Sequence, residues 1–194
     1  MNAMTSGDTA PRNAVFFGGC IPASPDEEHL AHDIGAMLAE HGFVLLHGGY
    51  NGLMEHAAKG AAAHGGSVVA VTLDGMQWGA FNPHVTEARS LATMGERMHA
   101  FLDEADVIIA MAGGIGTLHE MTAAIWYAGN IRPVPVVIAG ATAQRLTAFL
   151  RDQGWVYASP TRPLGFLHEI SDSADLGPLL QPPGALRGQG SEPC

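Results

Sequence analysis

Residues 105–126 constrain the fold more than any other stretch, because they read as a strand, a glycine-rich loop and a helix in direct succession. Residues 107–109 are a short β-branched apolar run, typical of a strand buried on both faces of a parallel sheet. The loop that follows contains Gly113, Gly114 and Gly116. Because glycine has no Cβ, a ligand can lie directly against the backbone N–H groups of this loop.

The helix that starts near Thr117 makes this loop a candidate phosphate site. The N-terminus of a helix presents free N–H groups and a partial positive charge, which together favour anions. The spacing G-G-x-G differs from the dinucleotide fingerprint G-x-G-x-x-G, and the lysine of a P-loop is missing. The sequence therefore predicts a phosphate cradle of a different kind at the carboxyl edge of a sheet.

The rest of the chain repeats the pattern of a strand followed by a helix or a glycine turn. Apolar runs predict five main strands, at residues 14–17, 43–46, 68–72, 107–109 and 134–138, with a terminal loop and strand within 155–170. This order predicts a single-domain, Rossmann-like α/β fold, a doubly wound open parallel sheet with helices on both faces. Glycine turns follow the first, second and fourth strands, and we expect them to converge where the strand order reverses.

Length and composition limit the domain plan and the location. We expect one domain at residues 13–176, with a flexible tail at 1–12 and a Pro/Gly-rich flexible tail at 177–194. Residues 73–90 read as a long functional loop. No apolar stretch is long enough to cross a membrane and the start lacks the features of a signal peptide, so we expect a cytoplasmic protein without a membrane partner.

Composition also excludes several kinds of partner and cofactor. A net charge of −10 with nine basic residues opposes nucleic-acid binding, which requires many phosphates to be neutralised. Cys20 and Cys194 are the only cysteines, so no thiolate metal site can form. Lys59 is the only lysine and lies in an alanine-rich helical stretch, which argues against a pyridoxal-phosphate decarboxylase.

Three motifs, in order, resemble those of the LONELY GUY family of nucleotide phosphoribohydrolases. The segment G-G-x-G-T-x-x-E, which ends at Glu120, resembles the family's P-G-G-x-G-T-x-x-E, with Ala112 in place of proline. The loop and helix start around Gly48 resemble G-G-G-x-x-G-L-M, with Tyr50 in place of a glycine, a substitution that narrows the space above this loop. The segment with Arg97 resembles M-x-x-R-K, with Met98 in place of lysine.

The resemblance implies hydrolysis of the N-glycosidic bond of a nucleoside 5′-monophosphate, giving free base and ribose 5-phosphate. The substrate would be a cytokinin riboside 5′-monophosphate, AMP or CMP, with no cofactor and no metal, and the enzyme would be a homodimer joined by the helices after the second and fourth strands. Glu120 and Arg97 would be catalytic. The phosphate- and ribose-binding candidates are Gly113, Gly114, Gly116, Thr117, Gly48, Gly49, Gly52, Glu55, Gly18 and Gly19.

Each main site residue also has an ordinary structural interpretation. Thr117 and Glu120 have the spacing of a capping box, so an alternative role for the Glu120 carboxylate is simply to cap its own helix. Arg97 could pair with a nearby acid on the surface, and Glu55 could be a buried helix residue. His119 could donate a proton to the leaving base, although surface solvation fits it better.

Two other functions stay open at this stage. The same cradle could belong to a non-catalytic nucleotide or molybdenum-cofactor carrier. It could also belong to an enzyme that transfers the ribosyl group to a second base through a nucleophilic carboxylate.

Overall fold

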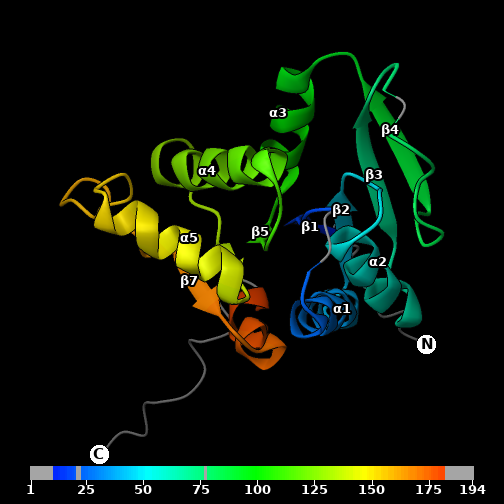
Figure 1. Cartoon of the computed structure of the whole chain (residues 1–194), viewed down its shortest axis with the longest axis horizontal. Helices are drawn as coiled ribbons and strands as arrows, with labels where there is room; N and C mark the ends of the chain where they lie inside the picture. Colours follow the sequence, from blue (N-terminus) through cyan, green and yellow to red (C-terminus); the bar gives the residue numbers. More distant parts are fainter. Residues whose placement is uncertain (1–10, 21–22, 77, 182–194) are drawn as a thin grey trace, which may run out of the picture.

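The computed structural model describes residues 11–20, 23–76 and 78–181. Within them lies one parallel sheet of seven strands in the order β4-β3-β2-β1-β5-β6-β7 (Figure 1). The strands are β1 (Arg12–Phe17), β2 (Phe43–His47), β3 (Val68–Leu73), β4 (Glu87–Leu91), β5 (Val107–Ala110), β6 (Val136–Ala139) and β7 (Leu167–Ile170). The helices are α1 (Pro25–Glu40), α2 (Leu53–Ala63), α3 (Met94–Glu104), α4 (Ile115–Asn130), α5 (Ala141–Asp152) and the 3-10 helix η1 (Ser173–Leu180). The predicted doubly wound α/β fold is confirmed.

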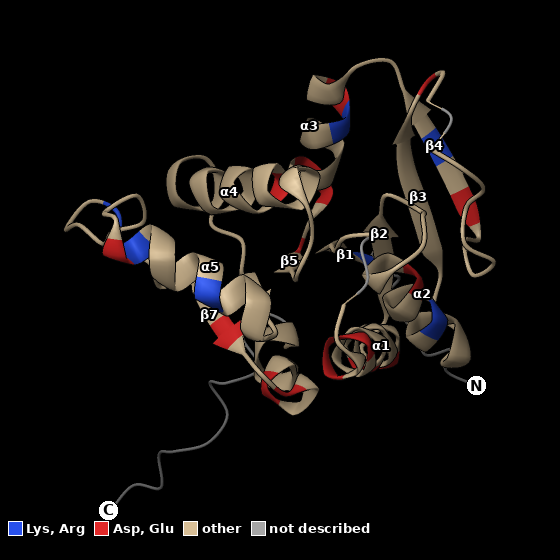
Figure 2. Ribbon diagram, viewed as in Figure 1, with Lys and Arg blue, Asp and Glu red and all other residues tan. Residues whose placement is uncertain are grey.

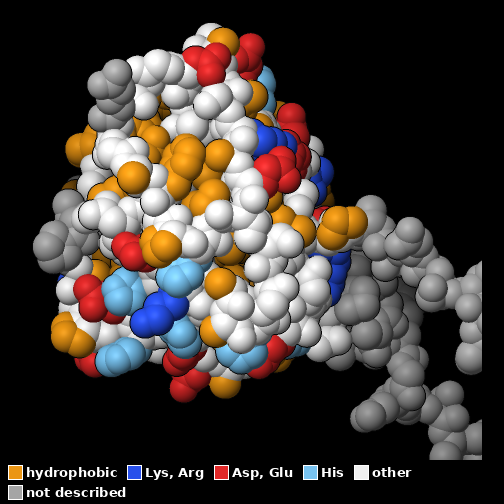
Figure 3. Space-filling model, turned by 90° about the vertical axis from the view of Figure 1, so that its right-hand side faces the viewer, with side chains coloured by type: hydrophobic (Ala, Val, Ile, Leu, Met, Phe, Trp, Pro, Cys, Tyr) orange, Lys and Arg blue, Asp and Glu red, His pale blue; other side chains and the backbone are white. Residues whose placement is uncertain are grey.

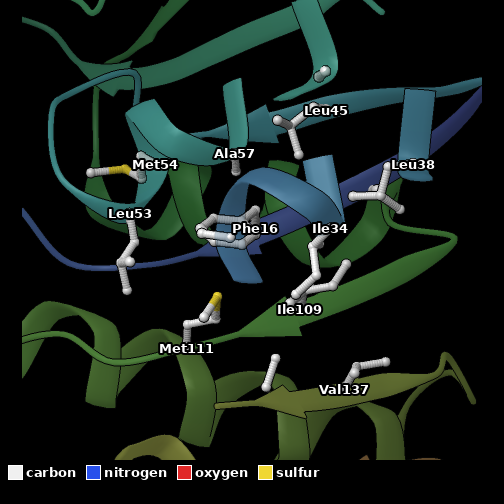
Figure 4. Close-up of a cluster of buried hydrophobic side chains, with 14 of the residues drawn as sticks. Phe16, Ile34, Leu38, Leu45, Leu53, Met54, Ala57, Ile109, Met111 and Val137 are labelled. Carbon is white, nitrogen blue, oxygen red and sulfur yellow. The ribbon is translucent and has the colours of Figure 1, made fainter. Parts of the chain in front are cut away.

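Helices cover both faces of the sheet, and each face has its own apolar core. On one face α1, α2 and η1 pack around Phe16 and Ile109 (Figure 4). On the other face α3, α4 and α5 pack around Phe17 and Ile108. Neighbouring residues of one strand therefore enter different cores, as the period of two in a strand requires. Burial on both faces explains why β5 and the last four residues of β1, the part that is fully buried, consist of apolar residues.

The strand order reverses between β1 and β5, and the glycine loops meet there as predicted. The Gly19 N–H donates a hydrogen bond of 2.8 Å to the carbonyl of Ala112. A Cβ on Gly19 would lie only 2.5 Å from the Cα of Gly113, so the two loops touch through their backbones. Ligands of open α/β sheets bind at this position.

Two glycines let α1 and α2 cross in backbone contact. A Cβ added to Gly35 would lie 1.9 Å from the carbonyl oxygen of Ala57, and one on Gly60 would lie 1.9 Å from that of His32. Pairs of histidine and glutamate on the surface join the same two helices, among them His56 with one carboxylate of α1. Figure 3 shows histidines beside acidic side chains on this side of the molecule.

Gly60→Ala is therefore expected to lower the free energy of unfolding by about 1–3 kcal/mol, because the new methyl group meets a backbone carbonyl that cannot rotate away. Gly95→Ala is the control, since a Cβ there finds open space in the first turn of α3. Alanine is also the better helix former, so the control variant should match or exceed the parent protein in stability. Urea unfolding of both variants measures the difference. Equal stability of the two variants would contradict the close crossing.

The structure corrects three local predictions. Residues 73–90 are not one long loop, because β4 begins at Glu87 and pairs with β3 along the sheet edge. Ser24 and Glu27 have the sequence spacing that predicts a capping box at the start of α1, but Glu27 does not close one. Ser24 caps the helix alone, while the Glu27 carboxylate accepts a hydrogen bond of 3.1 Å from the Thr142 N–H across the fold.

Residues 177–180 are also not part of a flexible tail. The 3-10 helix continues through these positions, and Leu180 is buried against the α1 face of the sheet. Residues 182–194 and 1–10 lie outside the described part. In the described part of the chain, no helix is long and apolar enough to span a membrane.

Candidate active site

A cavity of about 350 Å³ lies at the strand-order reversal. Its wall contains glycines from the loops after β1, β2 and β5, namely Gly18, Gly19, Gly48, Gly114 and Gly116. Thr117, His119 and Glu120 come from the first turns of α4, and Arg97 comes from α3. Among the described residues that line this cavity, Arg97 is the only lysine or arginine, and it accounts for the basic band on α3 in Figure 2.

The two candidate catalytic residues form a largely buried ion pair. Nη1 of Arg97 donates a hydrogen bond of 2.9 Å to Oε1 of Glu120, and the two side chains are only 8% and 14% exposed. Arg97 is held from two further sides, because its Nε donates to the carbonyl of Val71 at 2.9 Å and its guanidinium lies over the Phe101 ring. The pair thus joins α3 to α4 across the cavity. The alternative of a surface arginine is wrong.

The alternative of a capping box at Glu120 is wrong as well. The α4 helix begins after Gly114, so Thr117 lies inside the first turn and does not cap it. Thr117 is buried instead against Gly113, where an added Cβ would lie 2.1 Å from the Thr117 Oγ1. Gly113 is therefore required by the packing of this threonine, and the Glu120 carboxylate is free to point at Arg97.

The environment shifts the acidity of two groups at the cavity. Burial raises the pKa of the Glu120 carboxyl above its ordinary value, while the Arg97 guanidinium opposes that rise. Partial burial and the Glu120 charge raise the pKa of the Cys20 thiol, which lies at the cavity wall. Since the thiolate is the nucleophilic form, Cys20 is a poor nucleophile at neutral pH.

Four predicted site residues do not line this cavity. Gly113 faces a neighbouring cavity beside α5. Gly49 has φ = +89° and Gly52 has φ = +73°, so both serve the turn between β2 and α2. An added Cβ on Gly52 would lie 2.3 Å from the carbonyl oxygen of Gly19, which ties this turn to the β1 loop. Glu55 is half-buried one turn along α2 and is absent from the cavity wall.

Aromatic residues complete the wall on the side of β2 and β3. Tyr50 is buried and Trp78 is half-exposed, and their ring centroids lie 5.6 Å apart. Asn82 fixes this region from a position that no sequence motif marked, because its buried amide donates to the carbonyls of Gly49 and Tyr50. Only the run of turn-forming residues around Asn82 could have drawn attention to it.

His47 is the other residue that sequence reasoning missed. The prediction that Tyr50 replaces a motif glycine is wrong. Aligned on Gly52, the motif G-G-G-x-x-G has its first glycine at His47, and Tyr50 occupies a variable position. The ring is fully buried; the Gly49 N–H donates to its Nδ1 at 2.8 Å, which leaves the proton on Nε2. Nε2 has no hydrogen-bond partner among the described residues. Burial lowers the pKa of His47 to about 4.

Acid should therefore destabilise the protein through His47. Its pKa is lowered by folding, so the unfolded chain binds the extra proton between pH 6.5 and about 4, and stability falls as the pH falls through this range. From pH 7.5 to 5 we expect His47 alone to remove about 2 kcal/mol of the free energy of unfolding. Urea titrations of His47→Gln should show a loss smaller by that amount, with exposed His29→Gln as the control. An unchanged loss in His47→Gln would contradict a buried neutral ring.

The chain is similar to known proteins in both sequence and fold. A family model described as the SLOG cluster4 family matches residues 14–162. The cytokinin riboside 5′-monophosphate phosphoribohydrolase of Mycobacterium tuberculosis is 31% identical over 79% of this chain and 85% of that protein. The protein of the same name from Mycobacterium marinum is 33% identical over 60% of this chain, and the match spans only 63% of that relative. The structure of a molybdenum cofactor binding protein from Rippkaea orientalis has a TM-score of 0.67 at 25% identity, over 89% of this chain and 96% of that one.

Proposed function

Because the chain belongs to the SLOG cluster4 family, as the LONELY GUY motifs indicated, we propose that it hydrolyses the N-glycosidic bond of a nucleoside 5′-monophosphate. The products are a free base and ribose 5-phosphate. One observation carries the proposal: a carboxylate and a guanidinium, both largely buried, meet at 2.9 Å beside a glycine-rich helix N-terminus. A carboxylate at this position can stabilise the positive charge that develops on a ribose when its bond to the base breaks.

The glycine loop and the start of α4 hold the phosphate. Gly114 and Gly116 line the cavity at the start of α4, where the first N–H groups of a helix lack intrahelical partners, and an added Cβ on either glycine meets nothing within 4 Å. The helix N-terminus supplies the partial positive charge that a strongly acidic protein otherwise lacks at this point. Phosphate binding at the start of α4 places the ribose next to Glu120, which lies about one turn further along the helix.

The reaction separates the base from C1′ of the ribose. The C1′–N bond breaks and its electron pair leaves with the base, while positive charge develops on the ribose ring. The Glu120 carboxylate stabilises that charge and orients a water, whose oxygen bonds to C1′ and whose proton passes to the carboxylate. The departing base takes up one proton from solvent, and Glu120 later releases its proton to solvent, so the carboxylate is restored. Arg97 favours the ionised form of Glu120 against the effect of burial and holds the carboxylate at the cavity wall.

We also propose a homodimer formed through α2 and α4. The outer side of α4 presents Ile115, 81% exposed, and Trp126, 60% exposed, which a monomer would leave in water. Ile115 is next to the phosphate loop, so a partner there would close the site. Sedimentation of the full chain tests this assembly, and a monomer at micromolar concentration would contradict it.

Incubation with AMP, CMP, GMP, UMP and isopentenyl-AMP tests the reaction and its base. Chromatography should show one free base together with ribose 5-phosphate. Formation of a new nucleotide when a second base is added would instead indicate ribosyl transfer.

The second candidate is a carrier that binds without chemistry. The likeness to the Rippkaea orientalis cofactor-binding protein over nearly the whole chain favours it. Saturable binding of a nucleotide or of the cofactor, with no base released from any nucleotide, would support this function and replace the first.

A further inference from the structure

We infer that Tyr50 and Trp78 form the base-binding wall of the cavity and that this wall selects a purine over a pyrimidine. The inference rests on the proposed function, because it assigns one end of the same cavity to the base. It concerns the two aromatic residues after β2 and β3, which lie outside the pair formed by Arg97 and Glu120.

Short contacts set the order of groups along the cavity. From Glu120 the ion pair leads to Arg97, whose Nη2 lies 3.2 Å from where a Cβ of Gly48 would be. The same position on Gly48 is 3.8 Å from the Tyr50 ring, and Trp78 follows at 5.6 Å between ring centroids. In the strand order, β1 separates the loops after β2 and β3, which carry Tyr50 and Trp78, from the loop after β5, which leads into the cradle on α4. The cradle and the aromatic pair therefore lie at different ends of the cavity. A nucleotide whose C1′ is at Glu120 and whose phosphate is on the cradle must direct its base to Tyr50 and Trp78.

The aromatic wall is held in place before any ligand binds. The Tyr50 hydroxyl is 2.8 Å from Oγ1 of Thr72, and its ring packs against Phe81. Asn82 ties the loop after β3 to the loop after β2 with three hydrogen bonds, one from its N–H and two from its side-chain amide. Trp78 is 49% exposed in the same loop and has a ring face available. A preformed surface loses little conformational entropy when a base stacks on it.

The chemistry of this end of the cavity fits an uncharged, flat ring. Met54 lies beside Tyr50 there, and the lining residues carry no charge beyond the ion pair and His119. Stacking on an aromatic side chain contributes to binding in proportion to the overlapping ring area. Purines present two fused rings, so they gain more from this wall than single-ring pyrimidines do.

Tryptophan fluorescence provides a readout that does not depend on turnover. The chain has three tryptophans, and the two others, Trp126 and Trp155, line a different cavity. In Glu120→Gln carrying Trp126→Phe and Trp155→Phe, Trp78 is the only emitter and the nucleotide is not consumed. AMP should quench this emission saturably, and ribose 5-phosphate should compete with AMP without quenching.

Substitution of Trp78 in the otherwise unchanged protein gives the second readout. Trp78→Ala should weaken AMP binding about tenfold, as expected for one lost stacking contact, and reduce the preference for AMP over CMP. Its affinity for ribose 5-phosphate should not change, and Trp78→Phe should recover most of the loss for AMP.

Three outcomes overturn this inference: no quenching by bound AMP, equal quenching by ribose 5-phosphate, or unchanged AMP and CMP affinity in Trp78→Ala. If base is released from AMP while these outcomes occur, only the base wall is wrong. If AMP quenches the emission of Trp78 but no base is ever released, the inference of a base-binding wall is supported and the proposed hydrolysis is wrong.

Discussion

Replacing Glu120 by glutamine is expected to lower kcat by at least about 100-fold, on the scale of one lost preorganised electrostatic contact. Glutamine keeps the size of the side chain and can still accept the hydrogen bond from Arg97. It cannot carry the negative charge that opposes the positive charge developing on the ribose. Affinity for ribose 5-phosphate should stay close to that of the parent protein, because the phosphate is held by the glycine loop.

Steady-state rates of base release measure this loss. Glu104→Gln is the matched control, since that carboxylate pairs with Arg89 on the surface and should leave turnover unchanged. The parent protein should lose activity in acid with an apparent pKa above the ordinary glutamate range, because burial raises the pKa of Glu120. Parent-like kcat in Glu120→Gln would remove this residue from the mechanism.

Arg97→Ala has the second large effect, and it acts on both activity and stability. Without the guanidinium, the Glu120 carboxylate stays in a largely buried site with no partner. Removing one partner of a buried ion pair typically destabilises a protein by about 3–5 kcal/mol, unless the remaining acid takes up a proton. Loss of the guanidinium also removes the interaction that opposes the rise in the pKa of Glu120, so the carboxyl takes up a proton more readily and loses the charge that the reaction needs. Base release should fall together with stability.

The control for this variant is Arg89→Ala, which breaks a half-exposed ion pair with Glu104. Surface pairs contribute at most about 1 kcal/mol, so that variant should unfold almost as the parent does. Denaturant unfolding and base release are measured on both proteins. Equal stability of the two variants would show that the Arg97–Glu120 pair is not buried in solution.

The strands buried on both faces and the glycine loops could be predicted from the sequence, because their signals are local. Runs such as residues 107–109 have no polar face, and the loops that follow them are too rich in glycine to form either regular element. Parallel topology then brings the loops together, so the cradle could be located without coordinates.

Long-range partners could not be predicted. Glu27 has the spacing of a local cap, yet its carboxylate binds the backbone of Thr142, 115 residues away. The strand β4 lies at the sheet edge and is largely polar, so it lacks the apolar pattern of the other strands. The Arg97–Glu120 pair is buried by elements that meet only in the folded chain. The same holds for the hydrogen bond from Asn82 to the carbonyl of Tyr50.

The most direct test of the proposed function is a product analysis of AMP incubated with the full chain in the presence of a chelator. Hydrolysis at C1′ predicts adenine and ribose 5-phosphate in equal amounts, at a rate that saturates with AMP. Adenosine and inorganic phosphate would show that a different bond breaks. AMP recovered unchanged, with saturable binding, would contradict the enzyme and identify the cavity as a carrier site.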